Sequence, residues 1–329
     1  MSERGDDGVL LGLDIGGTKI GLSIGTREGR VLAADRLLVD PGAAPETVLA
    51  ECRTRILAML AQRGVDESRV AALGAACPGP LDYKAGRFIN PPNNPRWHGF
   101  ALRDWLRSSF SCRAAMMNDA NAAALAEWMW GAARGATTAV FLTMSTGMGA
   151  GLIIDGRLYE GPLGLAGEIG RLRLGADDEG PVGFGRRGSA EGYCSGPGMA
   201  QVAHTEAIIC THTNEPSRLV DALRETGSVS PEVLCEAARA GDAAARRVTD
   251  RVAEKLGRLM AIMTDMLNPE VFVLGTIGTA YPELFIPRAA EVLGREAIPA
   301  AAASVQVRPS GLADRGHQQA IAVAVHAIS

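Results

Sequence analysis

The sequence of 329 residues predicts an α/β protein of about two domains, built from two related halves. The first observation is a pattern of strand, glycine turn and strand near the N-terminus. The second is the order of strand, helix and strand that follows. The third is a repeat of the opening pattern, in which residues 137–144 lead through a glycine turn to residues 152–154.

The elements of the first half are predicted from short apolar segments and from the turns between them. Residues 9–14, 20–25 and 31–39 are apolar and are separated by turns that contain glycine, which predicts three strands in an antiparallel meander. Apolar residues recur at a spacing of three to four over 45–63, which predicts a helix. The uninterrupted apolar run 70–76 then predicts a buried strand.

The second half ends in longer elements. An alanine-rich helix is predicted over 241–267, because the chain then reaches Asn268 and Pro269, which do not continue a helix. Residues 271–278 predict a buried strand that leaves through glycines. The last predicted element is a helix over 313–327.

Composition excludes several classes of protein. Lys and Arg total 33 against 37 Asp and Glu, for a net charge of −4, so neither nucleic acid nor an anionic membrane is expected as the partner. No apolar run reaches ~18 residues, no signal peptide is recognisable, and no DNA-binding segment is expected ahead of residue 9. Six cysteines without a C-x-x-C pair indicate reduced thiols and a cytoplasmic location.

The first glycine turn has the chemistry of a phosphate site. Gly16 and Gly17 let a ligand approach the backbone, and the Thr18 hydroxyl adds a donor. Asp14 would face phosphate oxygens only with a cation between them, and Mg²⁺ held through water fits an oxygen site. A tight hairpin with a solvated aspartate explains the same residues.

The second turn, residues 145–151, favours the phosphate interpretation. It contains Thr146 and Gly147 and repeats the logic of the first turn. Two such turns, one in each half, would hold a polyphosphate from opposite sides. The pair therefore predicts a nucleotide with its metal.

Eight segments together resemble the ROK family of sugar kinases, within the fold shared by actin, hexokinase and Hsp70. The resemblance covers nearly the whole chain. It implies a two-lobed actin-like ATPase (ribonuclease H-like) fold with a cleft between the lobes, a small lobe of residues 1–122 with the helix 313–329 packed back on it, and a large lobe of residues 123–312. The matching segments are DIGGTK (14–19), CPGPLD (77–82), PNNPRW (92–97), NDANAAALAE (118–127), STGMGAG (145–151), GLAGEIG (164–170), GRRGSAE (185–191) and NPEVFVLG (268–275).

The resemblance implies roles on the sugar side. Asp119 would accept the proton of the attacking sugar hydroxyl, and Asn118 and Asn93 would bind the sugar. Glu168 and Glu191 would bracket hydroxyls at its other end. From the residues alone, Asn118 or Asp119 could instead be a helix N-cap, and both glutamates could be loop acids in solvent.

Three further residues complete the predicted site. The resemblance places Gly79 beside the sugar and Lys19 and Gly275 beside the nucleotide. Thr276 follows Gly275 where the family usually has a second glycine. Asn94 and Arg96 are explained by an Asn/Pro turn anchored by Trp97, so neither is assigned to the site.

The sequence departs from the family at a structural zinc site. Arg171, Val182, Phe184 and Ser189 stand where the family has a histidine and three cysteines. Valine and phenylalanine carry no lone pair and arginine stays protonated, so no zinc is predicted. Arg171 would instead donate to a sugar hydroxyl or an anionic group. The G-x-G-x-x-G pattern at 183–188 follows no strand and does not indicate a dinucleotide site.

These features predict an ATP- and Mg²⁺-dependent kinase acting on the 6-hydroxyl of a hexose, with glucose as the expected substrate. A homodimer or homotetramer is expected from the resemblance. Three alternatives stay open: a kinase for an amino or N-acyl hexosamine or another sugar, a non-catalytic sugar-sensing ROK protein, and a filament or chaperone ATPase of the same fold.

Overall fold

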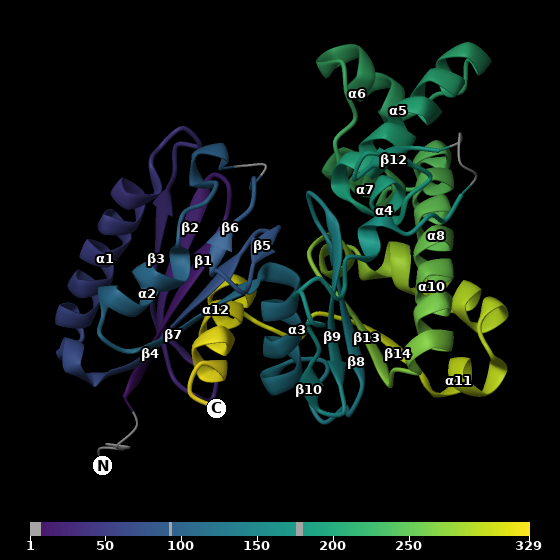
Figure 1. The fold of residues 1–329 in the computed structure, drawn as a ribbon. Helices are drawn as coiled ribbons and strands as arrows, with labels where there is room; N and C mark the ends of the chain where they lie inside the picture. The colour runs from purple at the N-terminus through teal and green to yellow at the C-terminus, as the bar shows by residue number, and fades with distance from the viewer. Residues whose placement is uncertain (1–7, 92–93, 176–179) are drawn as a thin grey trace. The chain divides into compact units, whose positions relative to one another are not determined.

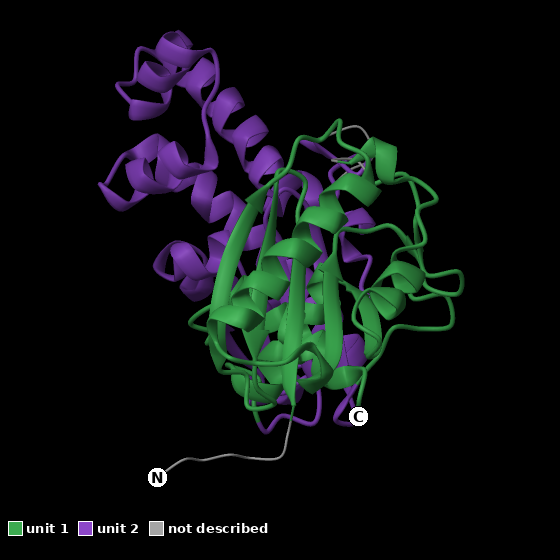
Figure 2. Cartoon of the chain, turned by 90° about the vertical axis from the view of Figure 1, so that its left-hand side faces the viewer, with its two compact units in different colours: residues 1–134, 158–166, 311–329 green, residues 135–157, 167–310 purple. Residues whose placement is uncertain are grey.

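The computed structural model describes residues 8–91, 94–175 and 180–329. The chain divides into two compact units, coloured separately in Figure 2. Unit 1 comprises Met1–Arg134, Leu158–Ala166 and Gly311–Ser329, and unit 2 comprises Gly135–Arg157 and Gly167–Ser310. Residue 122, the expected end of the small lobe, lies inside a helix that unit 1 contains whole. The lobe boundaries given above stay a prediction.

Unit 1 holds the predicted meander, the first helix and the last helix of the chain (Figure 1). Its elements are β1 (Val9–Ile15), β2 (Lys19–Gly25), β3 (Val31–Leu38), α1 (Pro45–Gln62), η1 (Glu67–Arg69), β4 (Val70–Cys77), β5 (Leu81–Asp82), β6 (Arg87–Phe88), η2 (Pro95–Trp97), α2 (Leu102–Ser109), β7 (Arg113–Asn118), α3 (Asp119–Trp130) and α12 (Arg315–His326).

The sheet of unit 1 has the order β3-β2-β1-β4-β7. β1, β2 and β3 pair antiparallel, which confirms the meander, while β4 pairs parallel to both β1 and β7. The helix predicted over 45–63 and the strand over 70–76 are confirmed as α1 and β4. Parallel pairing of β1, β4 and β7 brings three strand ends to one edge of the sheet.

The two faces of this sheet are packed differently. On one face Leu11 and Leu13 of β1 lie in a core with Ile56 of α1 and Leu106 of α2. On the other face α12 packs against β1 and β4 and against α3. Figure 1 shows this helix in yellow beside the strands. The C-terminal helix therefore completes the core of a unit whose strands begin at residue 9.

Unit 2 repeats the plan with larger helices. Its elements are β8 (Ala139–Met144), β9 (Met148–Ile154), β10 (Arg157–Leu158, which ends in unit 1), η3 (Ile169–Arg171), β11 (Val182–Gly183), β12 (Arg186–Arg187), α4 (Ala190–Cys194), α5 (Gly196–Thr213), α6 (Arg218–Thr226), α7 (Pro231–Arg239), α8 (Ala243–Leu267), β13 (Val271–Leu274), α9 (Ile277–Ala280), α10 (Pro282–Glu296), α11 (Pro299–Ser304) and β14 (Gln306–Pro309).

The sheet order of unit 2, β10-β9-β8-β13-β14, matches that of unit 1 strand for strand. β8 and β9 pair antiparallel, and β13 pairs parallel to β8 and β14. This agreement confirms that the chain contains two related halves. The helix predicted over 241–267 is confirmed as α8, which begins after the N-cap Asp242 and ends at Leu267, with Asn268 as its C-cap.

Two predicted boundaries in unit 2 were wrong. The second glycine turn spans residues 145–147 only, because Met144 pairs with Met148 and the antiparallel ladder continues from there. Gly149 and Gly151 therefore lie in β9, not in the turn. The strand predicted over 271–278 ends at Leu274, and α9 begins at Ile277.

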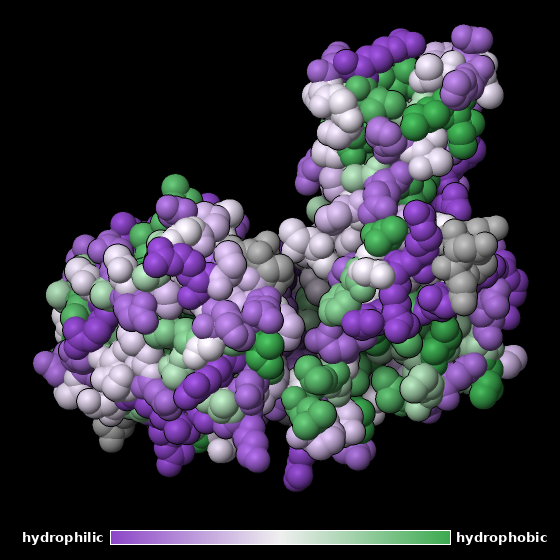
Figure 3. All heavy atoms as spheres, turned by 45° about the horizontal axis from the view of Figure 1, so that its top comes forward, coloured by the Kyte–Doolittle hydropathy of each residue, from purple (hydrophilic) through white to green (hydrophobic). Residues whose placement is uncertain are grey.

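Among the described residues, no helix is long and apolar enough to cross a bilayer. On the face drawn in Figure 3, hydrophilic and hydrophobic residues are interspersed.

Candidate functional site

In unit 1 the predicted carboxylates lie at the ends of β1 and β7, parallel strands on either side of β4. Asp14 of β1 pairs with Ala76 of β4, and in the next row Cys77 pairs with Asn118 at the end of β7. Asp119 follows directly as the first residue of α3. Because neighbouring strands are ~4.8 Å apart, the backbones of Asp14 and Met117, which share a row, are about 10 Å apart, and Asp119 follows Met117 by two residues. Ligands of open α/β sheets bind at this kind of edge.

Asp14 is a largely enclosed carboxylate with a defined partner. Its Oδ1 accepts a hydrogen bond of 2.7 Å from Gln319 Nε2 on α12. Burial raises the pKa of Asp14, and the Gln319 hydrogen bond and the positive charges of His317, Lys19 and Arg315 oppose that rise. Sequence reasoning missed Gln319, because it lies 305 positions along the chain from Asp14.

The beginning of α3 combines a cap with the predicted base. Asn118 Oδ1 accepts from the Ala120 N–H at 2.9 Å, so Asn118 is the N-cap of α3. Its Nδ2 lies beside Gly79, where a Cβ would come within 3.1 Å of it. Asp119 Oδ1 accepts from the same Ala120 N–H at 2.8 Å. The cap interpretation therefore holds, and it fixes both polar side chains at the strand end.

Tyr83 supports this junction and was not anticipated from the sequence. Its Oη accepts a hydrogen bond of 3.0 Å from the backbone N–H of Asn118. Burial raises the pKa of Tyr83, which keeps the phenol neutral. Gly164 lies directly against its ring, where a Cβ would overlap Cδ2. Tyr83 follows the segment CPGPLD, but no spacing in the sequence connects it to Asn118.

The first glycine turn is a tight hairpin with an exposed tip. The Gly16 N–H donates to the Lys19 carbonyl at 2.9 Å, and Thr18 and Lys19 are exposed. Asn94, which is 1% exposed, donates from Nδ2 to the Gly17 carbonyl at 3.4 Å. Asn94 therefore connects its loop to the turn, a role that the sequence did not suggest. Asn93 lies outside the described residues.

In unit 2 the second glycine turn is bound to Glu191 of α4. Glu191 Oε2 accepts from the Met148 N–H at 3.2 Å, and Oε1 accepts from the Phe184 N–H at 2.7 Å. A Cβ at Gly147 would lie 3.0 Å from Glu191 Oε2. Glu191 is therefore not a loop acid in solvent. Burial, and then the charge of Glu191, raise the pKa of Glu168 at the start of η3.

The four residues at the zinc positions of the resemblance make other contacts. The Arg171 guanidinium lies 5.1 Å from the centre of the Phe184 ring. Ser189 Oγ donates to the Gly183 carbonyl at 2.9 Å and caps α4. The backbone N–H and carbonyl of Val182 form two hydrogen bonds with the side-chain amide of Gln201. In the part of the chain that is described, no group of three or more His, Cys, Asp or Glu residues is placed to hold a metal.

Gly275 lies at the end of β13, where the backbone allows little else. Its N–H donates to the Leu142 carbonyl at 2.8 Å, and a Cβ there would collide with the Phe141 ring. Thr276 has a φ of +52°, which is unfavourable for a β-branched residue. Thr143 Oγ1 lies 3.4 Å from Thr276 Oγ1. The conformation explains why glycine suits position 276.

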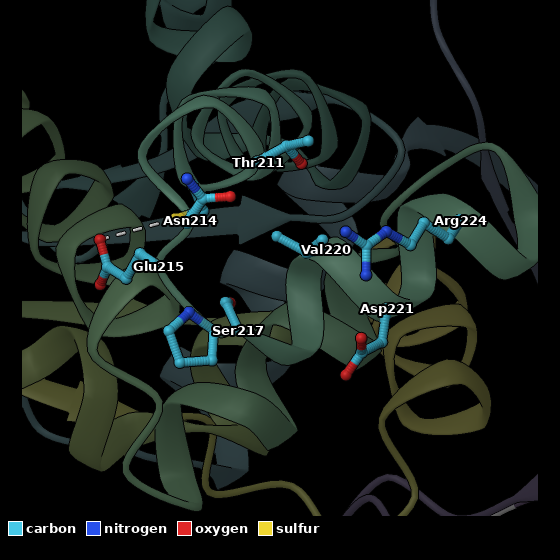
Figure 4. A pocket seen from close by; sticks show the side chains of 9 residues that line it. Thr211, Asn214, Glu215, Ser217, Val220, Asp221 and Arg224 are labelled. Atoms are coloured by element: carbon cyan, nitrogen blue, oxygen red, sulfur yellow. Dashed lines mark hydrogen bonds between the residues drawn. The ribbon is translucent and has the colours of Figure 1, made fainter.

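A cavity elsewhere in unit 2 contains none of the predicted residues. Figure 4 shows it beside α6, with Glu215, Asp221 and Arg224 among its lining side chains. Glu215 is paired with Arg247 at 2.8 Å. None of the residues that line the cavity belongs to the sheet of unit 2.

The chain matches the ROK family model over residues 10–319. It is 31% identical to a glucokinase of Halalkalibacterium halodurans over 80% of this chain and 79% of that protein. It is also 31% identical to an N-acetylmannosamine kinase of Yersinia pestis, over 82% of this chain and 83% of the relative. A xylose repressor of Caldicellulosiruptor bescii is 25% identical over 94% of this chain and 76% of its own length.

Solved structures agree with this assignment. A ROK hexokinase from Thermus thermophilus is 28% identical with a TM-score of 0.78, over 97% of this chain and 99% of that one. A ROK glucokinase from Streptomyces griseus, solved with glucose and AMPPNP, is 29% identical with a TM-score of 0.77, over 97% of this chain and 100% of that one. These likenesses confirm the actin-like ATPase fold. The chain belongs to the ROK family.

Proposed function

We propose that the chain is an ATP-dependent sugar kinase that transfers the γ-phosphoryl group to the 6-hydroxyl of a hexose, with glucose as the expected acceptor. One observation carries the proposal: the parallel register of β1, β4 and β7 puts Asp14 and Asp119 at one sheet edge, two strands apart. The glucokinase relative and the glucokinase structure with AMPPNP support it.

The acceptor end of the reaction would rest on α3 and the residues that hold it. Asp119 accepts the proton of the attacking hydroxyl, and Asn118 Nδ2 and the open backbone at Gly79 face the sugar. Phosphoryl transfer needs mainly alignment and charge stabilisation, so one carboxylate held in place by its helix is sufficient. Tyr83 contributes by fixing the backbone of Asn118. Asn93, Glu168, Arg171 and Glu191 complete the proposed sugar contacts.

The nucleotide would bind the two glycine turns. Gly17, Thr18 and Lys19 would provide the first set of donors, and Thr146 and Gly147 the second. The N–H groups of Gly16 and Gly275 donate within the protein, so these two glycines would contribute only close approach of the nucleotide to the backbone. Asp14 is the residue that fits Mg²⁺, since a single carboxylate together with phosphate oxygens and water is a usual set of magnesium ligands. When bound, the ion neutralises charge on the phosphate oxygens.

A second acceptor class has one observation in its favour. Arg171 replaces the histidine expected from the resemblance and is held over the Phe184 ring, so the pocket would present a fixed cation. An N-acetylmannosamine kinase is among the relatives. An N-acyl hexosamine, whose acyl oxygen could accept from that cation, is therefore the alternative substrate, with glucose first.

A panel of sugars tests the proposal. The purified protein is incubated with ATP and Mg²⁺ and with glucose, mannose, glucosamine, N-acetylglucosamine or N-acetylmannosamine, and ADP release is followed with a coupled assay. We expect glucose to give the highest kcat/KM, and mass spectrometry to identify a hexose 6-phosphate. If a sugar binds but no sugar of the panel causes ADP to form from ATP, the result would contradict the proposed kinase activity and support a sugar-sensing protein.

A further inference from the structure

The carboxylate of Asp14 is held by the C-terminal helix rather than by its own hairpin. Gln319 Nε2 donates to Oδ1 at 2.7 Å, and Gln319 is 9% exposed. The second oxygen, Oδ2, lies against Gly316, where a Cβ would come within 2.6 Å of it. Both oxygens of Asp14 are thus bounded by residues one turn apart on α12.

Glycines in the sheet allow α12 to lie close enough for these contacts with Asp14. A Cβ at Gly74 of β4 would overlap the backbone nitrogen of Ala324, and one at Gly12 of β1 would lie 2.9 Å from the Ala320 Cβ. Without those side chains the α12 backbone lies directly on β1 and β4. The helix is therefore fixed relative to Asp14, and so is the amide of Gln319.

The amide has the right chemistry for a partner of a metal-binding carboxylate. A neutral N–H donor orients the carboxylate and leaves its negative charge intact, whereas a lysine there would compete with a cation. Outer partners of this kind commonly set the geometry and affinity of a metal ligand. A glycine at 316 leaves room for Oδ2.

We propose that Gln319 and Gly316 are positioning residues that hold the Asp14 carboxylate in the orientation that receives the Mg²⁺ of a bound nucleotide. The inference rests on the proposed function, because it assumes a Mg²⁺-nucleotide at Asp14. It assigns a role in that site to the far end of the chain.

The test compares two neighbouring glutamines. Gln319→Leu removes the donor to Asp14. Gln318→Leu is the matched control, because Gln318 contacts Gly29 and Asp314 and not Asp14. Calorimetry measures ATP affinity with Mg²⁺ and again with EDTA. We expect Gln319→Leu to weaken ATP affinity in Mg²⁺ by roughly 10-fold to 100-fold. Its ATP affinity in EDTA should be unchanged. Gln318→Leu should have the ATP affinities of the unaltered protein under both conditions.

If Gln319→Leu and the unaltered protein have equal ATP affinities in Mg²⁺, the inference is overturned. It is also overturned if Gln319→Leu loses as much ATP affinity in EDTA as in Mg²⁺, because that result indicates a structural role. If Gln319→Leu does not fold, Gly316→Ala decides: its methyl group would displace Oδ2, and a folded variant with full Mg²⁺-dependent affinity refutes the proposal. If the unaltered protein itself shows no Mg²⁺-dependent ATP binding, the proposed function fails instead.

Discussion

The two sheets have the same strand order but carry different chemistry at equivalent strand ends. Asp14, one pair before the hairpin in unit 1, corresponds by register to Thr143 in unit 2. The end of β7 leads to Asp119, whereas the end of β14 leads to Ser310. Unit 1 thus presents carboxylates where unit 2 presents hydroxyls.

This difference shows how one topology serves two tasks. A parallel edge collects side chains from strands that are distant in sequence, whatever those side chains are. In unit 1 the collected groups are charged and are held by caps and by α12. In unit 2 the carboxylates Glu168 and Glu191 come from η3 and α4, outside the sheet. Acid–base chemistry is therefore expected from unit 1, and backbone and hydroxyl contacts from the edge of unit 2.

The largest expected effect comes from Asp119. Asp119→Asn removes the proton acceptor at the unit 1 edge, so kcat should fall roughly 10²- to 10⁴-fold, while calorimetry should show unchanged ATP affinity. Ser310→Ala changes the equivalent position in unit 2, for which no role in the reaction is proposed, so kcat should stay close to that of the unaltered protein. A filament or chaperone ATPase would still hydrolyse ATP after Asp119→Asn. That result would contradict the assignment of acid–base chemistry to the sheet edge of unit 1.

The next effect separates Asp14 from Thr143. Asp14→Asn removes the charge that would hold Mg²⁺, and kcat/KM for ATP should fall roughly 10²-fold, a loss of the size that follows removal of one preorganised group that stabilises transition-state charge. Thr143→Val removes only a hydroxyl contact of 3.4 Å to Thr276, so its kinetics should stay close to those of the unaltered protein. Steady-state assays at varied Mg²⁺ distinguish the two, and similar losses in both variants would contradict the assignment.

A smaller effect concerns Glu168, whose pKa is raised by burial and then by Glu191. The native state therefore binds the Glu168 proton more tightly than the unfolded state, whose value is near 4.5. The free energy of unfolding falls as pH rises from 4.5 through the native pKa. Glu168→Gln should be more stable than the unaltered protein at pH 7 and no more stable at pH 4, by urea unfolding.

The same variant should lose sugar affinity, because Glu168 is a proposed sugar ligand. We expect KM for the sugar to rise about 10-fold, the loss of a hydrogen bond to a charged group. If Glu168→Gln is more stable at pH 7 but has an unchanged KM for the sugar, Glu168 is not a sugar ligand. The raised pKa of Glu168 would still be supported.

The smallest effect is expected at Thr276, where φ is +52°. Thr276→Gly relieves the strain of a β-branched residue in that conformation and should raise the free energy of unfolding by about 1 kcal/mol. Urea unfolding measures the change. A loss of stability would show that the Thr143 hydroxyl contact outweighs the strain.

Local elements were predictable because their causes are local. Short apolar segments and glycine turns predicted the meander, and Asn268 marked the end of the helix α8. The extent of the second turn was not predictable, because the pairing of Met144 with Met148 decides it and glycine alone does not. The same limit applies to the segment 271–278, where an apolar run contains both a strand and a short helix.

The candidate site divides in the same way. Residue types and spacing named Asp14, since a carboxylate after an apolar run is visible in the sequence. The roles of Asn118 and Asp119 came from the family resemblance, because the residues alone also fit a helix N-cap. Gln319, Tyr83 and Asn94 were invisible, because each acts through one contact across a long stretch of chain. No periodicity records such contacts.

The sequence by itself determined the strands of the N-terminal meander, the first glycine turn, the absence of lysine and arginine excess, and the chemical group that follows β1. Only the tertiary structure decided which strand ends share an edge and which helix secures them. The reason is physical: hydrogen-bonding and apolar periodicity act between near neighbours, whereas parallel pairing and the packing of α12 on glycines bring together residues whose separation along the chain leaves no local trace.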